Sequence, residues 1–378
     1  MRNRYRPQLK KYISLLLVLM MLVSVLPMGA LAEQAENQPT YLLFTSDVHN
    51  VPPGNTYANQ SAERMGRWIT GVSDALGGVT FDSMGFCGDL GSAVNGSNGY
   101  WTAVKNVMNI AEGNAAVNRC VYTYGNHDAE SPGNGKNPTA DYTACTSKMV
   151  QCGGQHYDGY SVFCCGAKAG YYQNFDNADL AKLDTFLAGC AEDEPVFVLS
   201  HFPLHYDGKR TISNTTAVIN VLNKYPNAVF LWGHNHTDVD SHYTYVYTGS
   251  IDGVDINFTY ASAGAMVDLE YNEPQSAQIA GKGLTVRIND DQTMTFAYYD
   301  VNCKSLGETT VDFSGENAHV NTTGYTAAAD FIDGGRYVIT APELSLALTD
   351  NVNPGFMIGA FDNKPSSGQL LLAGYKKP

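Results

Sequence analysis

The chain has 378 residues, of which 44% are hydrophobic and 11% aromatic, and this composition excludes an intrinsically disordered protein. Its length is sufficient for one large core with a small appendage. Asp and Glu outnumber Lys and Arg by 37 to 23, giving a formal net charge of -14. No nucleic-acid groove is expected, because such binding depends on Lys and Arg side chains that neutralise phosphates.

The first segment of the chain has the features of an export signal. A basic stretch from Arg2 to Lys11 precedes an apolar run from Ile13 to Leu26, and Ala30-Leu31-Ala32 supplies small residues at the usual cleavage distance. Because the apolar run is short for a membrane span, we expect residues 1–32 to be a cleaved signal peptide that leaves no stable span. The protein is then secreted or held at the cell surface. An uncleaved anchor is the alternative.

From residue 40 onward, short apolar runs alternate with helical segments. Strands are predicted at 41–46, 83–87, 120–124, 161–165, 195–199 and 228–232. Helices are predicted at roughly 60–76, 101–112, 177–188 and 214–224. This alternation is typical of βαβ units, and it predicts an α/β fold with two sheets flanked by helices. The last strands of the domain are predicted to be antiparallel, from alternating runs at 243–248, 256–260, 283–288 and 293–300.

Two regions depart from this alternation. Residues 129–160 are polar and glycine-rich, which predicts a long loop bordering the functional site. Residues 316–378 contain short β-like pieces such as Arg336–Ile339. We therefore expect a catalytic domain over residues 40–315. Residues 316–378 are expected to form a small β-rich segment, which is a marginal size for an independent domain and a candidate for contact with the cell surface.

Eight cysteines in an exported chain favour disulfides. Cys145 and Cys152 lie in one polar region and are the most favoured bridge. Cys87 and Cys120 lie in apolar strands, where buried free thiols are an equally good interpretation. The pairing of the other cysteines is left open.

Metal-type ligands follow five of the predicted strands, and five of the nine histidines lie among them. One aspartate after a strand would be an ordinary helix cap, but five clusters in order are not explained that way. Open α/β sheets place their sites at the carboxyl ends of strands. The clusters are Asp47-Val48-His49, Gly88-Asp89, Gly125-Asn126-His127-Asp128, Ser200-His201 and Gly233-His234-Asn235-His236.

The clusters combine carboxylates, imidazoles and a side-chain amide without thiolates. This mixture is typical of Mn, Fe, Zn or Ni sites rather than Ca or Mg sites. Two such ions about 3.5–4 Å apart lower the pKa of a bridging water and clamp a phosphoryl group for attack. The sequence therefore predicts two divalent transition-metal ions and a small phosphoester substrate.

The ordered clusters resemble those of the calcineurin-like metallophosphoesterase superfamily, over about residues 40–300. The resemblance implies a four-layer α/β/β/α sandwich with mixed sheets and a dinuclear metal centre. It further implies that His127 is a catalytic residue and not a ligand, oriented by Asp128 through its ring. The implied ligands are Asp47, His49 and His236 for the first ion, Asp89 for both ions, and Asn126, His201 and His234 for the second.

Two sequence differences indicate which branches of the superfamily this chain does not resemble. Purple acid phosphatases have glycine in place of His49 and a tyrosine shortly after the Gly-Asp block, where this chain has Leu90-Gly91-Ser92-Ala93. The purple branch is therefore excluded from the expectation. The 5′-nucleotidase branch usually continues as Gly-Asn-His-Glu-Phe-Asp, whereas residues 125–130 read Gly-Asn-His-Asp-Ala-Glu, which disfavours that branch.

The function predicted from the sequence is an exported phosphoesterase that hydrolyses phosphate mono- or diesters with a hydroxide activated by two metal ions. Few cations lie near the predicted site, Arg64 and Lys136 among them, and this favours diesters weakly. The alternative is a cell-surface binding or adhesion protein on the same scaffold. His156, His242 and His319 are predicted to be structural, and His205 to be a solvated loop residue. A glycan acceptor at Asn235 inside the cluster favours a bacterial export route.

Overall fold

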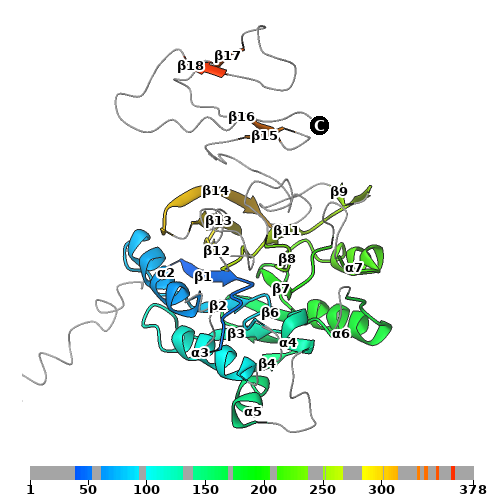
Figure 1. The fold of residues 1–378 in the computed structure, drawn as a ribbon. Coiled ribbons are helices and arrows are strands. Elements are labelled where there is room, and N and C mark those ends of the chain that lie inside the picture. The colour runs from blue at the N-terminus through cyan, green and yellow to red at the C-terminus, as the bar shows by residue number, and fades with distance from the viewer. Residues whose placement is uncertain are drawn as a thin grey trace, which may run out of the picture. The chain divides into compact units, whose positions relative to one another are not determined.

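Two mixed β-sheets pack face to face, and helices cover both outer faces (Figure 1). The structure is a computed structural model. It describes residues 39–52, 61–92, 99–130, 139–168, 173–204, 211–236, 250–251, 253–266, 283–300 and 302–313, together with the backbone of four short strands between residues 330 and 361. The predicted α/β/β/α sandwich with mixed sheets is confirmed.

The first sheet has seven strands in the order β14-β13-β12-β1-β2-β3-β4. The β1–β4 strands run parallel to one another, and β12 joins β1 antiparallel, followed by β13 and β14. Their bounds are β1 Thr40–Thr45, β2 Ser83–Phe86, β3 Cys120–Thr123, β4 Met149–Val150, β12 Gly283–Ile288, β13 Thr293–Tyr299 and β14 Ser305–Asp312.

The second sheet has five strands in the order β11-β8-β7-β6-β5. All neighbours in it are parallel except β5, which pairs antiparallel with β6 at the edge. Their bounds are β5 Cys152–Tyr157, β6 Tyr160–Cys165, β7 Val196–Ser200, β8 Ala228–Trp232 and β11 Thr259–Ser262. A separate two-stranded pair is formed by β9 Ser250–Ile251 and β10 Val254–Asp255.

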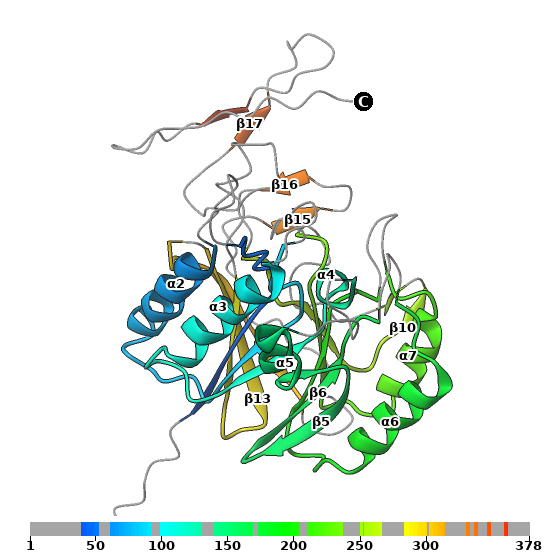
Figure 2. The ribbon, with the colours of Figure 1, turned by 60° about the horizontal axis from the view of Figure 1, so that its bottom comes forward.

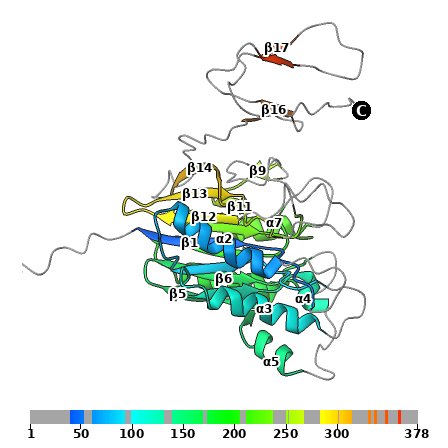
Figure 3. The ribbon, with the colours of Figure 1, turned by 60° about the vertical axis from the view of Figure 1, so that its left-hand side comes forward.

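The helices form the two outer layers, and Figure 3 looks onto the one that lies in front of the first sheet. The first sheet is covered by α2 Ser61–Ala75 and α3 Tyr100–Glu112. The second sheet is covered by α6 Asn177–Ala188 and α7 Thr215–Leu222. Two shorter helices, α4 Asn126–Glu130 and α5 Ala140–Thr146, follow β3 (Figure 2).

The central strands are apolar on both faces because both faces are covered. In β1, Leu43 packs with the α2 and α3 side chains, whereas Phe44 points into the layer between the sheets. In β7, Val198 packs toward α6 and α7, whereas Phe197 and Leu199 point between the sheets. Successive side chains of a strand alternate between faces, so one short run supplies residues to two hydrophobic layers.

Most predicted strands and helices agree closely with the observed bounds, but residues 129–160 are not one loop. They include α5, β4 and β5, while residues 131–138 lie outside the described part. The sequence of β5 resembles that of a loop because β5 is a half-exposed edge strand with two glycines. Gly154 is required there, since a Cβ would lie 2.4 Å from the Phe186 ring.

Two further predictions are corrected. The 256–260 region does not belong to the antiparallel strands, because β11 runs parallel to β8. The antiparallel strands are β12 to β14. The geometry contradicts the predicted Cys145–Cys152 bridge. Cys145, in α5, packs with the α2 and α3 side chains and its Sγ contacts the carbonyl of Trp101 at 3.6 Å, whereas Cys152, which opens β5, packs against the cluster of α6 and α7. The predicted strand at 243–248 lies outside the described residues.

The predicted β-rich character of the C-terminal segment is confirmed by two short antiparallel pairs. One pair joins β15 Asp330–Ile332 to β16 Arg336–Val338, and the other joins β17 Leu346–Leu348 to β18 Gly359–Phe361. Among the described residues, no helix is both long and apolar enough to cross a membrane.

The layer between the sheets is expected to carry much of the stability of the fold. Leu199 is fully buried there, so Leu199→Ala should leave a cavity and lower the free energy of unfolding by about 2–5 kcal/mol. Urea unfolding followed by tryptophan fluorescence measures this change. Lys182→Ala, at an exposed position of α6, is the control and should change that free energy by no more than about 0.5 kcal/mol. Equal effects of the two variants would contradict the assigned core.

Candidate metal centre

All the sequence-predicted ligands lie directly beyond the carboxyl ends of central strands. In the first sheet, Asp47 and His49 follow β1, Asp89 follows β2, and Asn126 follows β3. In the second sheet, His201 follows β7, and His234 and His236 follow β8. The strands concerned are neighbours within each sheet. Their ends therefore bring residues far apart in the sequence to one edge of the sandwich.

The backbone at these positions is unusual. Seven non-glycine residues have positive φ in the described part of the chain, and five of them are predicted ligands. The left-handed region costs free energy for residues with a Cβ and is found mostly at functional sites. The five are Asp47 (φ 49°), His49 (φ 46°), Asp89 (φ 53°), His234 (φ 71°) and His236 (φ 48°).

Three glycines allow the turns that carry the ligands to approach one another. A Cβ on Gly125 would lie 2.0 Å from Asp89 Oδ1, and one on Gly233 would lie 1.9 Å from Ser46 Oγ. Gly88 has φ +91°, and a Cβ there would lie 2.4 Å from the Gly125 nitrogen. The absence of a side chain at these glycines therefore permits the close approach of all three turns.

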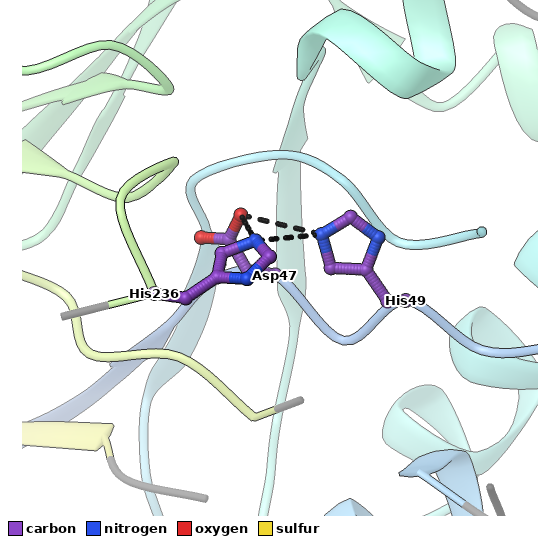
Figure 4. Close-up of side chains that lie close together, drawn as sticks. All are labelled: Asp47, His49 and His236. Carbon is purple, nitrogen blue, oxygen red and sulfur yellow. Dashed lines mark hydrogen bonds and ion pairs between the residues drawn. The ribbon is translucent and has the colours of Figure 1, made fainter. Parts of the chain in front are cut away.

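One group of ligand atoms comprises Asp47, His49 and His236 (Figure 4). His49 Nε2 lies 2.9 Å from His236 Nε2, and Asp47 Oδ1 lies 3.1 Å from His236 Nε2. The other carboxylate oxygen, Asp47 Oδ2, accepts a hydrogen bond from the His234 backbone N–H at 2.8 Å. That bond orients the carboxylate so that Oδ1 faces the two imidazole rings.

A second group comprises Asp89, His201 and His234, all of them buried, with Asn126 beside them. His201 Nδ1 donates to the carbonyl of Cys87 at 2.7 Å, because a carbonyl can only accept. In neutral His201 the Nε2 lone pair therefore faces polar atoms of three neighbouring residues. These are Asn126 Oδ1 at 3.1 Å, His234 Nδ1 at 3.0 Å and Asp89 Oδ2 at 3.1 Å.

Asp89 lies between the two groups. Its Oδ2 atom is 3.1 Å from His201 Nε2 in one group and 3.7 Å from His49 Nε2 in the other. Its Oδ1 atom accepts from the His127 backbone N–H at 2.9 Å. One carboxylate oxygen is thus held by the backbone while the other faces both groups, which is the arrangement a bridging carboxylate needs.

The charges of these buried groups depend on one another. Burial raises the pKa of Asp47, but His236 and His201 outweigh it and hold that pKa well below its usual range. Burial likewise opposes the charged form of His201, yet Asp89 and Asp47 raise its pKa to about 9. The pKa of His49 is lowered, chiefly by burial. Burial opposes the charged form of Asp89 too, but His201 lowers its pKa, so both carboxylates are kept ionised inside the protein and need compensating positive charge.

The donor set fits divalent transition-metal ions. In each of the two groups the ligand atoms lie within 4.8 Å of one another. Asp47 Oδ1 is buried and faces His236 Nε2 at 3.1 Å and His49 Nε2 at 3.6 Å. Buried carboxylates and imidazole nitrogens that converge in this way need a proton or a metal cation among them. Imidazole and carboxylate ligands without thiolate match Mn, Fe, Zn or Ni.

Asp128 connects the turns that carry the ligands. Its Oδ2 atom accepts hydrogen bonds from the backbone N–H groups of Asp89 and Gly125, both at 2.8 Å. Its Oδ1 atom accepts from the Tyr100 hydroxyl at 2.5 Å and from the Leu90 N–H at 3.3 Å. Burial raises the pKa of Asp128 to about 6, and the charge of Asp89 adds to this effect. The role in orienting the His127 ring stays a prediction beside these observed contacts.

Sequence reasoning missed Tyr100. This residue is buried at the start of α3, and its ring packs on Gly91, where a Cβ would lie 2.8 Å from the ring. The sequence contains no signal for this contact, because Tyr100 and Asp128 are brought together only when α3 packs on the first sheet.

Of the remaining histidines, one lies beside the ligand groups and one lies away from them in the described residues. His127 is partly exposed and its ring packs edge-on against His49 at 4.9 Å between centroids. One ring nitrogen of His127 lies within 4.8 Å of ligand atoms of His49 and Asp89. His156 is structural, as predicted, since it stacks on Phe186 at 4.6 Å and contacts Ser161 Oγ at 2.9 Å. His205, His242 and His319 lie outside the described residues.

Comparisons with known proteins bear on the family and the fold. The sequence model described as calcineurin-like phosphoesterase matches residues 40–238. A purple acid phosphatase isolated from yellow lupin (Lupinus luteus) seeds is similar in structure with a TM-score of 0.51 and 14% identity, over 73% of this chain and 54% of the lupin chain. This chain thus spans about half the length of that enzyme. No curated protein matches the sequence significantly.

Two further solved structures are similar at lower TM-scores. The phosphopantetheinyl hydrolase from Mycobacterium tuberculosis has a TM-score of 0.34 and 14% identity, over 63% of this chain and 94% of that one. A putative 5′-nucleotidase from Staphylococcus aureus, solved with α-ketoglutarate, has a TM-score of 0.39 and 12% identity, over 79% of this chain and 56% of that one.

The fold and the ligand clusters define a metallophosphoesterase-type sandwich, and the matched segment runs from β1 to just beyond His236. The chain belongs to the calcineurin-like phosphoesterase family. The likeness to the lupin enzyme is one of fold. That this chain lies outside the purple branch stays a prediction from His49 and residues 90–93.

Gly125→Ala should disrupt the centre, because the new Cβ would overlap Asp89 Oδ1. We expect Mn²⁺ affinity to fall on the order of tenfold or more, as when a group supporting a ligand is removed. Metal content measured by mass spectrometry after Mn²⁺ reconstitution tests this. The control is Gly189→Ala at the end of α6, where the nearest atom to the new Cβ is 3.4 Å away. Wild-type metal content in Gly125→Ala would show that the close approach is not required.

Tyr100→Phe should weaken metal binding while preserving the ring that packs on Gly91. Loss of the bond to Asp128 loosens the link between the Asp89 and Gly125 turns, and such supporting contacts are typically worth about 10–100-fold in metal affinity or activity. Competition of Mn²⁺ against a chelating dye measures the affinity.

A matched control for this variant is Tyr225→Phe. The Tyr225 hydroxyl also donates to an aspartate, Asp184 Oδ1 at 2.7 Å, but between α6 and the end of α7. Its Mn²⁺ affinity should equal that of the wild type. If the Tyr100→Phe titration also overlays the wild-type curve, the linking role of Tyr100 is wrong.

Proposed function

We propose that this protein is an exported metal-dependent phosphoesterase that hydrolyses small phosphate mono- or diesters at a dinuclear centre. In this proposal the first ion is held by Asp47, His49 and His236. The second ion is held by Asn126, His201 and His234, and Asp89 binds both. Membership of the calcineurin-like phosphoesterase family supports the reaction class.

The observation that carries the proposal is the position of Asp89 between two separate ligand groups. Asp89 Oδ2 faces His201 Nε2 and His49 Nε2 at 3.1 and 3.7 Å, so one carboxylate is shared by both groups. A mononuclear site or a purely structural cluster would not need this sharing. When two divalent ions are bound at such a site, they supply an acidified water as nucleophile and offset the negative charge of the phosphoryl group.

His127 is the proposed acid–base residue. It is partly exposed, while the predicted ligands of the second group are buried. Its backbone N–H donates to Asp89 Oδ1 at 2.9 Å, and its ring packs edge-on against His49. The residue is thus held beside both ligand groups but reaches solvent. A ring nitrogen in that position can give a proton to the leaving oxygen of an ester.

The proposals that the substrate is small and that the protein is exported are based on the amino-acid sequence. We propose that the loops at residues 50–60, 91–100 and 129–160 contact the substrate; of these, residues 53–60, 93–98 and 131–138 lie outside the described part of the chain. Arg64, one cation predicted near the site, is on α2, and burial lowers its pKa. Export is supported by the basic and apolar composition of residues 1–32.

A metal-reconstituted activity panel tests the function. The full chain is loaded with Mn²⁺, Zn²⁺ or Fe²⁺ and assayed on chromogenic monoester, diester, nucleotide and phospholipid substrates. We expect two ions per chain and turnover of at least one ester. A protein that binds no ions and hydrolyses none of these substrates would support the binding or adhesion alternative and contradict the proposal.

His127→Ala should lower kcat by about 10²–10⁴-fold, the usual contribution of a general acid or base. Both ions should remain bound, because His127 is proposed as a catalytic residue and not as a ligand. Kinetics and metal content are measured on the same preparation. His156→Ala, on β5, is the control and should keep the wild-type kcat. Loss of an ion from His127→Ala would show instead that His127 is a ligand.

A further inference from the structure

Two cysteines outside the metal centre lie directly opposite each other. Cys152 is the first residue of β5 and Cys165 the last of β6, and the antiparallel register pairs their Cα atoms. Both are thiols in the structure. Figure 2 shows β5 and β6 side by side, with β5 at the edge of the second sheet.

The local hydrogen bonding favours a bridge at this pair. The Gly166 N–H donates to the Gln151 carbonyl at 2.7 Å, so residues 151 and 166 form a hydrogen-bonded pair. The adjacent pair, Cys152 and Cys165, is therefore of the non-hydrogen-bonded kind, in which Cα atoms lie about 4.5 Å apart and side chains are closest. Disulfides span Cα separations of about 4.4–6.8 Å.

The two side chains lie on the same face of the sheet. Cys165 is buried in the hydrophobic cluster that also holds the α6 and α7 side chains, and Cys152 packs against that cluster while partly buried. Cys164, the neighbour of Cys165, belongs instead to the cluster between the two sheets. The register therefore pairs Cys152 with Cys165 and excludes Cys164.

The pair is at the point where the chain passes from one sheet to the other. The β4 strand ends the first sheet, and β5 begins two residues later at the edge of the second sheet. Gln151 Nε2 donates to the carbonyl of Ala167 at 2.6 Å, and the Ala167 N–H donates to the Tyr124 carbonyl at 2.7 Å. Tyr124 directly precedes Gly125 and Asn126 of the metal centre.

We infer that Cys152 and Cys165 form a disulfide that fixes this crossing point. With a small disulfide such as oxidised glutathione as the oxidant, the Cys152 thiolate attacks one glutathione sulfur and releases one reduced glutathione. The Cys165 thiolate then attacks the Cys152 sulfur of the mixed disulfide and releases the second. Two protein thiols are oxidised and one glutathione disulfide is reduced to two thiols.

The bridge should stabilise the fold. It closes a loop from residue 152 to residue 165 and so restricts the unfolded chain. Burial raises the pKa of the Cys152 thiol to about 11 and that of the Cys165 thiol further above its usual range. Exchange in the folded protein is therefore expected to be slow, because the thiolate is the reacting species.

The test is peptide mapping of the full chain by mass spectrometry. The reduced protein is incubated with oxidised glutathione, and a second sample is refolded in a mixture of reduced and oxidised glutathione so that burial does not limit the reaction. We expect a peptide linked through Cys152 and Cys165, and a melting temperature about 5 °C above that of the reduced protein.

The control is Cys164→Ala, which should still form the Cys152–Cys165 link because Cys164 faces the other side of the sheet. Cys152→Ser should lose both the linked peptide and the increase in melting temperature. The inference is overturned if Cys152 is linked to another cysteine in the wild type. It is equally overturned if both thiols remain open to alkylation after refolding in the glutathione mixture.

Discussion

Five strand ends have to meet at one place for the ligand groups of this protein to exist, and the packing of the two sheets brings them together. The β1, β2 and β3 strands are parallel neighbours in one sheet, and β7 and β8 are parallel neighbours in the other. Phe44 and Leu199 lie in the hydrophobic layer that holds the sheets face to face. That layer therefore determines the distance from Asp89 to His201 as directly as it determines the stability of the fold.

Close approach of the turns is the second requirement, and it conflicts with ordinary backbone preferences. Asp47, Asp89 and His234 all adopt left-handed conformations, which cost free energy that packing elsewhere must offset. Gly125 and Gly233 remove side-chain atoms at the places where two turns would otherwise overlap. The centre is thus an arrangement that the surrounding fold imposes on its residues.

Electrostatics connects this geometry to function. Asp47 and Asp89 are buried and ionised beside histidine nitrogens, with pKa values held low by those histidines. Divalent ions would supply the same compensation without requiring the imidazole rings to be protonated. Asp128 and Tyr100 support this arrangement, because they join the Asp89 turn to the Gly125 turn through hydrogen bonds that involve no predicted ligand side chain.

The sequence by itself determined the class of fold, the strand after which each ligand falls and the family, because apolar runs and the residues directly after them are local features. It could not determine that β5 is an edge strand, since half-exposed strands with glycines resemble loops. Nor could it assign Cys152 a partner or show that Tyr100 reaches Asp128. Those contacts join residues from separate elements. Only the register of β5 on β6 and the packing of α3 on the first sheet decide them, because side chains distant in sequence become neighbours only when the sheets and helices pack.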